Sequence, residues 1–125
     1  MSLIIFGAIC VAGGVGAALR FIVDGVVRAR FPAVFPSGTA FINVTGSFLL
    51  GVLVGLSLAA ALPQDWVLIL GTGVMGGYTT FSTASVETMR LVQDREYRLA
   101  LVNGFGVLGA TVLLGLLGLL LGSLF

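Results

Sequence analysis

The sequence predicts an all-α membrane protein with four transmembrane helices, the third of them broken in mid-membrane. Of the 125 residues, 58% are hydrophobic and only 9% are charged, whereas a soluble domain has roughly 25% charged residues. The mean hydropathy is +1.19, and four long apolar stretches follow one another along the chain. Since a membrane-spanning helix needs roughly 20 apolar residues, we expect a single transmembrane domain over residues 1–125.

The first apolar stretch, residues 3–23, is expected to be a retained helix rather than a cleaved signal peptide. No basic residue precedes it, and it is longer than the apolar region of a signal peptide, which has about 7 to 15 residues. The other three helices are expected at about residues 38–62, 67–92 and 99–124. A tight turn from Pro63 to Trp66 is expected between the second helix and the third.

The basic residues predict the orientation of these helices. All six are arginines, and they lie in or beside the polar breaks at residues 24–37 and 93–98. With four helices these two breaks share one side, which the positive-inside rule assigns to the cytoplasm. We therefore expect a multi-pass protein of the cell membrane whose two termini lie outside the cytoplasm.

Glycine is unusually frequent, with 19 residues in the chain. Small residues recur every four positions at Ser47, Gly51 and Gly55, and again at Gly118 and Gly122, which places each set on one helix face. Lipid gives helices no hydrophobic reason to associate, so close backbone approach has to supply the attraction. We interpret these glycines as packing positions.

Composition excludes several classes of function. The chain has no histidine and one cysteine, so it lacks the commonest general base and metal ligand and has no internal disulfide. No nucleophile and base pair is present, and we expect the protein not to be an enzyme. The net charge of +1, without a basic cluster, argues against a nucleic-acid partner.

Residues 71–85 are expected to interrupt the third helix. Gly76 and Gly77 free the backbone there, and the hydroxyls that follow compete for its hydrogen bonds. These hydroxyls belong to Thr79, Thr80, Ser82, Thr83 and Ser85. Because irregular backbone survives in a membrane only inside protein or beside a polar cavity, the interruption predicts a site. Its amides, its hydroxyls and the ring edge of Phe81 suit a small anion.

Polar residues on two other helices extend this site. Thr39, Asn43 and Ser47 are spaced four apart in the second helix, and Asn103 and Thr111 share a face of the fourth. They form a discontinuous polar track through an apolar bundle. The alternative interpretation is that they make hydrogen bonds between helices, each contributing about 0.6 to 2 kcal/mol.

Two ionisable residues are expected in or near the membrane. Arg20 is expected to extend its side chain to the interface, in a structural role. Glu87 is about 16 Å beyond Gly76 at 1.5 Å per residue, which places it near the cytoplasmic mouth. It is expected to pair with Arg90, with a role in transport as the alternative.

The segment from Gly76 to Glu87, GGYTTFSTASVE, resembles the signature GGxTTFSTFSxE of the Fluc/CrcB fluoride channels. Residues 13–20 (GGVGAALR) and 38–46 (GTAFINVTG) are similar to the same family in order and spacing. The resemblance implies an antiparallel dimer of four-helix subunits, with two pores lined by both. It also implies passive fluoride export from the cytoplasm, which would relieve fluoride toxicity.

The resemblance also implies roles for residues by motif position. A structural sodium ion at the dimer interface would be held by the backbone carbonyls of Gly76 and Thr79. The fluoride-lining asparagine falls on Asn43, the first pore phenylalanine on Phe81, and the polar track of the fourth helix on Asn103, Val107 and Thr111. With the nearby hydroxyls, the expected fluoride pathway comprises Asn43, Phe81, Thr80, Ser82, Thr39, Asn103 and Thr111.

Two positions depart from the family pattern: the second signature phenylalanine is Ala84, and the middle track position is the apolar Val107. The arginine bias also argues against insertion in both orientations, which an antiparallel homodimer requires. We therefore favour a heterodimer with an oppositely oriented homologue, although a homodimer is possible. Alternatives are a non-conducting partner subunit and a small multidrug exporter, whose class needs a carboxylate that the first helix lacks.

Overall fold

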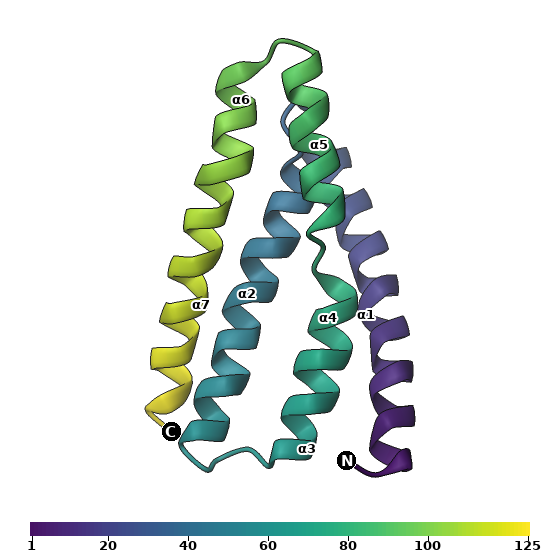
Figure 1. Cartoon of the computed structure of the whole chain (residues 1–125), viewed down its shortest axis with the longest axis vertical. Coiled ribbons are helices and arrows are strands. Elements are labelled where there is room, and N and C mark those ends of the chain that lie inside the picture. The colour runs from purple at the N-terminus through teal and green to yellow at the C-terminus, as the bar shows by residue number, and fades with distance from the viewer.

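The computed structural model describes residues 1–125, and all of its regular elements are helices (Figure 1). The first two helices are α1 (Leu3–Arg30) and α2 (Ser37–Leu58). The third apolar stretch forms one helical segment from α3 (Gln64–Val67), η1 (Leu68–Met75) and α4 (Gly76–Tyr78), and a second one, α5 (Ser82–Gln93). The fourth helix runs without a break through α6 (Tyr97–Leu101), η2 (Val102–Gly106) and α7 (Val107–Ser123), where η1 and η2 are π-helical.

The helices form an elongated bundle that runs up and down along its long axis (Figure 1). Both termini lie at one end, beside the connection from α2 to α3, while the connection from α5 to α6 lies at the other end (Figure 1). Three helices are long and apolar enough to cross a membrane: α1, α2 and Tyr97–Ser123. The remaining helix, the third, consists of two shorter pieces, residues 64–78 and 82–93. The predicted class is therefore confirmed: an all-α membrane protein of four helices with a broken third.

The first helix extends seven residues beyond the predicted end at Val23. Asp24 and Arg28 are one turn apart and form an ion pair within α1, with Arg28 Nε donating to Asp24 Oδ1 at 2.7 Å. This pair lets a polar turn continue the helix. The helix ends at Arg30, just before the segment that contains Pro32 and Pro36.

The predicted tight turn at residues 63–66 is wrong, because the chain reverses earlier. The second helix ends at Leu58, four residues before its predicted end, and Ala60 adopts a left-handed conformation with φ of 57°. The Ala61 N–H then donates to the Leu56 carbonyl at 2.9 Å, which is the capping geometry that normally uses glycine. Pro63 directly precedes α3, and Trp66, which was expected in the turn, lies within that helix.

Replacing Ala60 with glycine is expected to stabilise the protein by about 1 kcal/mol, because a left-handed conformation costs an L-residue roughly 1–2 kcal/mol. Thermal melting in detergent measures the effect. Ala61→Gly is the matched control and should not raise the melting temperature, since residue 61 has no positive φ. An Ala60→Gly protein that melts no higher than wild type would contradict the strain at residue 60.

Glycines bring α2 and α7 into direct backbone contact. A methyl group at Gly51 would overlap the Gly115 carbonyl oxygen, and one at Gly118 would overlap the Phe48 carbonyl oxygen. The same holds for Gly55 and Gly122, one turn further along each helix. The packing interpretation of these glycines is confirmed.

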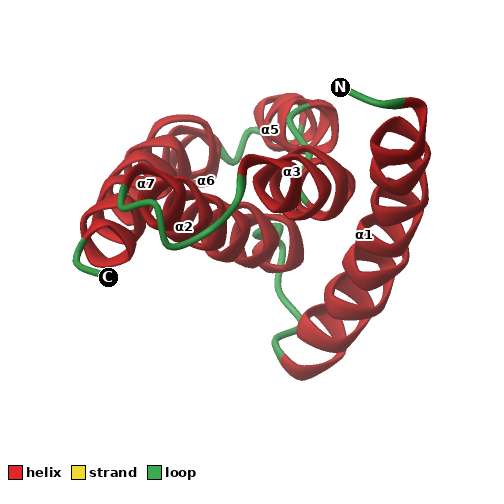
Figure 2. Cartoon of the chain, turned by 90° about the horizontal axis from the view of Figure 1, so that it is seen from below, coloured by secondary structure: helices red, strands yellow, loops and turns green.

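The third helix packs on α1 in the same way. A methyl group at Gly77 would overlap the Gly13 carbonyl oxygen, and one at Gly16 would overlap the Val74 carbonyl oxygen. Seen along the bundle, α1 lies on one side, α2 and α7 lie on the other, and the third helix lies between them (Figure 2). Gly77 therefore serves close packing and lies within α4, so the prediction that Gly76 and Gly77 free the backbone for the interruption is wrong.

Candidate functional site

The interruption of the third helix covers only Thr79, Thr80 and Phe81, about halfway along the bundle (Figure 1). Thr79 is extended, with φ −81° and ψ 162°, and its Oγ1 donates to the Met75 carbonyl at 2.9 Å. Thr80 Oγ1 accepts from the Thr83 N–H at 3.2 Å and so pairs one of the free N–H groups in the first turn of α5. Hydroxyl groups, rather than glycines, therefore end one helix and begin the next.

Asn43 holds the interrupted backbone from α2. Its Nδ2 donates to the Thr80 carbonyl at 2.7 Å, and its Oδ1 accepts from the Thr80 N–H at 2.8 Å. One side chain thus pairs both backbone groups of a residue outside any helix, where unpaired groups would cost several kcal/mol in a bilayer. The second Nδ2 hydrogen has no partner in the chain and is available as a donor.

A groove of about 340 Å³ opens beside the break, between α2, α5 and the fourth helix. It brings together five of the seven residues predicted for the fluoride pathway: Asn43, Thr80, Phe81, Asn103 and Thr111. Ala84 and Val107, the two departures from the family signature, lie in its wall. These five residues therefore share one groove, as the sequence predicts.

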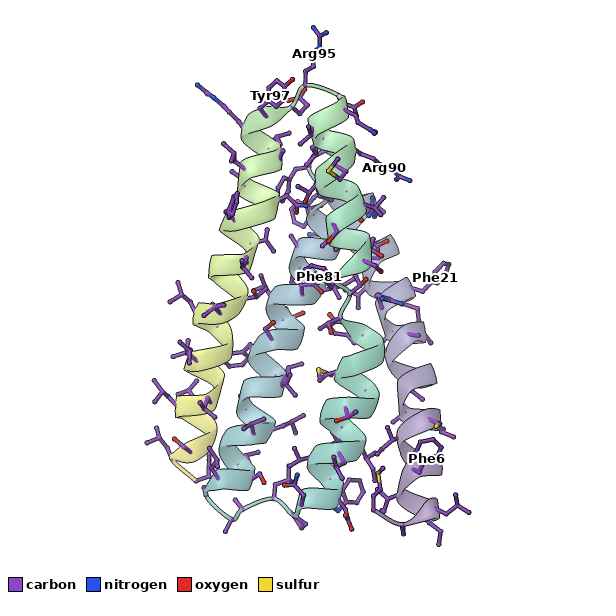
Figure 3. The ribbon with its side chains drawn as sticks, in the orientation of Figure 1. Phe6, Phe21, Phe81, Arg90, Arg95 and Tyr97 are labelled. Carbon is purple, nitrogen blue, oxygen red and sulfur yellow. The ribbon has the colours of Figure 1, made fainter.

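Phe81 projects from the break and is 87% exposed (Figure 3). A large apolar ring in that position has no packing partner within the chain. Ala84, three residues on, presents only a methyl group to the groove. This chain therefore supplies one aromatic ring at the break where the family signature has two.

The polar groups of the fourth helix already have partners. Asn103 is 6% exposed, and its Nδ2 donates to Thr88 Oγ1 at 2.8 Å and to the Ala84 carbonyl at 3.3 Å. Thr111 Oγ1 donates to the Leu108 carbonyl at 2.7 Å. Asn103 thus makes the hydrogen bonds between helices of the alternative interpretation, whereas the bond of Thr111 lies within its own helix. An anion in the groove would have to compete for both donors.

The two remaining predicted residues lie outside the groove. Ser82 is exposed at the start of α5 and lines neither cavity. Thr39 lines a second cavity of about 290 Å³, together with Arg20 and Thr83. Thr80 lines both cavities, so this one residue lies between the groove and the second cavity.

Glu87 lies in a polar network that the sequence pattern did not predict. Its Oε1 accepts from Thr39 Oγ1 at 2.7 Å and from Arg28 Nη2 at 3.2 Å, while its buried Oε2 has no partner. The expected pairing of Glu87 with Arg90 is wrong. Arg28 comes within reach because α1 continues past Val23 to Arg30.

Replacing Arg28 with alanine is expected to destabilise the protein by about 1 to 2 kcal/mol, because Glu87, only 8% exposed, would lose a charged hydrogen-bond donor. Arg90→Ala is the control, since Arg90 projects away from the bundle (Figure 3) and makes no ion pair with Glu87. Thermal melting compares the two variants. Equal losses would contradict the network.

Arg20 also differs from its expected interfacial position. Its Nη1 donates to the Thr79 carbonyl at 3.3 Å, so the guanidinium reaches the break rather than extending away from it. Arg20 and Arg28 were missed as partners of the site because long side chains reach elements that sequence spacing cannot place. Their only signal in the sequence was a charge within or beside an apolar helix.

The carbonyl groups at the end of α4 suit a monovalent cation. In a continuous helix the Thr80 N–H would bond to the Gly76 carbonyl, but here it bonds to Asn43. Gly76 itself is helical, and its carbonyl lies at the negative end of the helix dipole without a hydrogen bond. The Thr79 carbonyl follows three residues later and accepts only from Arg20. These two carbonyl oxygens are therefore suitable ligands for a cation such as sodium, which prefers oxygen.

A family model described as CrcB-like protein, Camphor Resistance (CrcB), matches residues 7–123. This chain belongs to the CrcB family. The family resemblance read from the signature at residues 76–87 is confirmed.

Curated relatives match most of the chain. Fluoride-specific ion channel FluC 1 of Leifsonia xyli is 54% identical over 117 residues, which is 94% of this chain and 85% of that protein. Fluoride-specific ion channel FluC 2 of Mycobacterium tuberculosis is 45% identical over 123 residues, covering 98% of this chain and 91% of that protein. FluC 1 of Listeria monocytogenes is 48% identical over 109 residues, 87% of this chain and 86% of its own length.

Proposed function

We propose that this chain is a subunit of a fluoride-selective channel through which fluoride leaves the cytoplasm passively. The observation that carries the proposal is the groove at the helix break, where Asn43, Thr80 and Phe81 converge. The curated relatives named as fluoride-specific ion channels support it. The composition also argues against an enzyme, because the chain has no histidine and no nucleophile and base pair.

The groove has the chemistry that a small, strongly hydrated anion needs. Such an ion crosses only if closely placed donors replace its water, and the free Nδ2 hydrogen of Asn43 is such a donor. The Thr80 hydroxyl donates to Thr83 Oγ1 at 3.2 Å and would have to turn to the ion. The edge of the Phe81 ring adds a positive potential without a fixed charge. Because no basic side chain lines the groove, the anion is not held too strongly to leave. Larger halides would be excluded by the narrow path.

The working unit is proposed to be an antiparallel dimer. The strongly exposed Phe81 ring and the open side of the groove support this, since a second subunit would cover both. The carbonyls of Gly76 and Thr79 would hold a sodium ion, which when bound supplies positive charge that fixes the crossing of two broken helices. The arginine-rich end of the bundle is proposed to face the cytoplasm of the cell.

A heterodimer is the form that this chain supports best. Ala84 removes one aromatic ring from the groove, and all the arginines except Arg20 lie toward one end of the bundle, where Arg90 and Arg95 project (Figure 3). The relatives are numbered FluC 1 and FluC 2, which is consistent with paired genes. The partner is proposed to be a homologue with the opposite arginine bias. Without that partner, this chain is expected to conduct fluoride weakly or not at all.

A second aromatic ring at position 84 should increase fluoride efflux through this chain in the absence of a partner. Ala84→Phe is expected to raise fluoride efflux from liposomes severalfold, because the ring would restore the second aromatic edge along the groove. Val86→Phe is the matched control on the same helix, outside the groove. A fluoride electrode measures both. Strong efflux from the unmodified chain alone would remove the need for a partner subunit.

The rival function is proton-driven export of cationic drugs by a small multidrug exporter. No carboxylate faces the groove, and Asp24, the one carboxylate of α1, pairs with Arg28. Fluoride efflux that persists after the proton gradient is collapsed, with no uptake of a cationic dye, supports the channel. Dye uptake that requires the proton gradient would favour the exporter.

A further inference from the structure

Arg20 brings a positive charge to the helix break without an acidic partner. Its guanidinium Nη1 donates to the Thr79 carbonyl at 3.3 Å. The carboxylate in the same cavity belongs to Asp24, and this carboxylate is paired with Arg28 instead. A cation at membrane depth without a counter-ion is rare and points to a function.

The acceptor of Arg20 is one of the two carbonyls proposed to hold sodium. The Arg20 guanidinium and the proposed sodium ion would therefore bind the same oxygen atom. In a medium of low dielectric constant, two positive charges on one carbonyl repel each other far more strongly than they would in water. A guanidinium bound to the Thr79 carbonyl thus weakens the binding of sodium to that carbonyl.

The same peptide unit connects this oxygen to the anion groove. The Thr79 carbonyl and the Thr80 N–H belong to one planar peptide bond. The N–H end donates to Asn43 Oδ1 at 2.8 Å, while the oxygen end accepts from Arg20. A positive group on the oxygen polarises the peptide and strengthens its N–H as a donor. Either cation would therefore hold Asn43 in place.

We propose that Arg20 competes with the monovalent cation for the Thr79 carbonyl and so sets the cation affinity of the break. The proposal rests on the sodium site of the proposed function. Removing the charge of Arg20 leaves the carbonyl to the cation alone. Sodium should then bind about tenfold more tightly or better, by the loss of a like charge a few ångströms away.

The test measures thermal stability of the purified full-length channel, in its dimeric form, while sodium replaces choline at constant ionic strength. Arg20→Gln is expected to lower the sodium concentration at half-maximal stabilisation about tenfold or more. Arg30→Gln removes the same charge from the same helix, at an exposed residue without a recorded partner, and should leave the midpoint unchanged. An unchanged or higher midpoint in Arg20→Gln overturns the proposal.

A second measurement uses the wild-type protein and does not depend on whether the variant folds. Competition is reciprocal, so sodium should release the Arg20 guanidinium and increase its rate of modification by phenylglyoxal, read by mass spectrometry. An equal or slower rate in sodium overturns the competition. If sodium stabilises wild type but neither Arg20 result appears, the inference fails and the sodium site stands. If sodium has no effect on wild type, the site itself fails, and the inference with it.

Discussion

Replacing Asn43 with leucine is expected to lower fluoride flux through the assembled channel by about a hundredfold. Leucine has a similar volume but leaves the Thr80 N–H and carbonyl unpaired, at about 1–3 kcal/mol each, and each 1.4 kcal/mol corresponds to a factor of about ten. The substitution also removes the one free amide hydrogen in the groove. Fluoride efflux from liposomes, at matched amounts of protein, measures the loss.

Two further variants separate the roles of Asn43. Asn43→Asp keeps an acceptor for the Thr80 N–H but places a second carboxylate oxygen against the Thr80 carbonyl, so flux should also be lost. Ser57→Ala, on the same helix, removes a hydroxyl that lies outside the groove, and should stay near wild type. Normal flux in Asn43→Leu would show that the path does not use this side chain.

The second large effect is expected at the contact between α2 and α7. Gly118→Ala should destabilise the protein by about 2 to 3 kcal/mol, since overpacking of this kind costs typically 1–3 kcal/mol. Here the added methyl group would overlap the Phe48 carbonyl oxygen and lie 3.0 Å from the Val52 nitrogen. Neither backbone atom can move without separating the helices. Melting temperature and elution as a single peak in detergent report the change.

Gly109→Ala is the control for Gly118→Ala. It lies on the same helix, and a methyl group there would meet nothing within 4 Å. The melting temperature should stay the same or rise, since alanine favours helix more than glycine does. If Gly118→Ala melted at the temperature of Gly109→Ala, close packing of α2 and α7 would not hold the bundle together.

The fold was largely predictable because bilayer thickness converts apolar length directly into helix count. What sequence reasoning missed were effects of neighbouring elements. The helix α1 continues to Arg30 because Arg28 forms ion pairs with Asp24 and Glu87. Gly76 and Gly77 looked like helix breakers, but Gly77 allows close contact with Gly13.

The site was predictable in its members but not in its hydrogen bonds. Asn43, Thr80, Phe81, Asn103 and Thr111 line one groove, as helix periodicity and motif position together predicted. Ser82 does not, because the extended Thr79 turns the start of α5 away from the register of the preceding helix. Thr39, in α2, lines the second cavity instead and donates to Glu87. The contact of Arg20 with Thr79 depends on a long side chain crossing between helices, which no sequence pattern encodes.

Fluoride selectivity is tested directly by efflux from liposomes that contain the assembled channel and are loaded with potassium fluoride or potassium chloride. After valinomycin makes the membrane permeable to potassium, the groove predicts rapid, passive fluoride efflux and no chloride efflux above that of protein-free liposomes. Chloride efflux as fast as that of fluoride, or no fluoride efflux with or without a partner subunit, would contradict it.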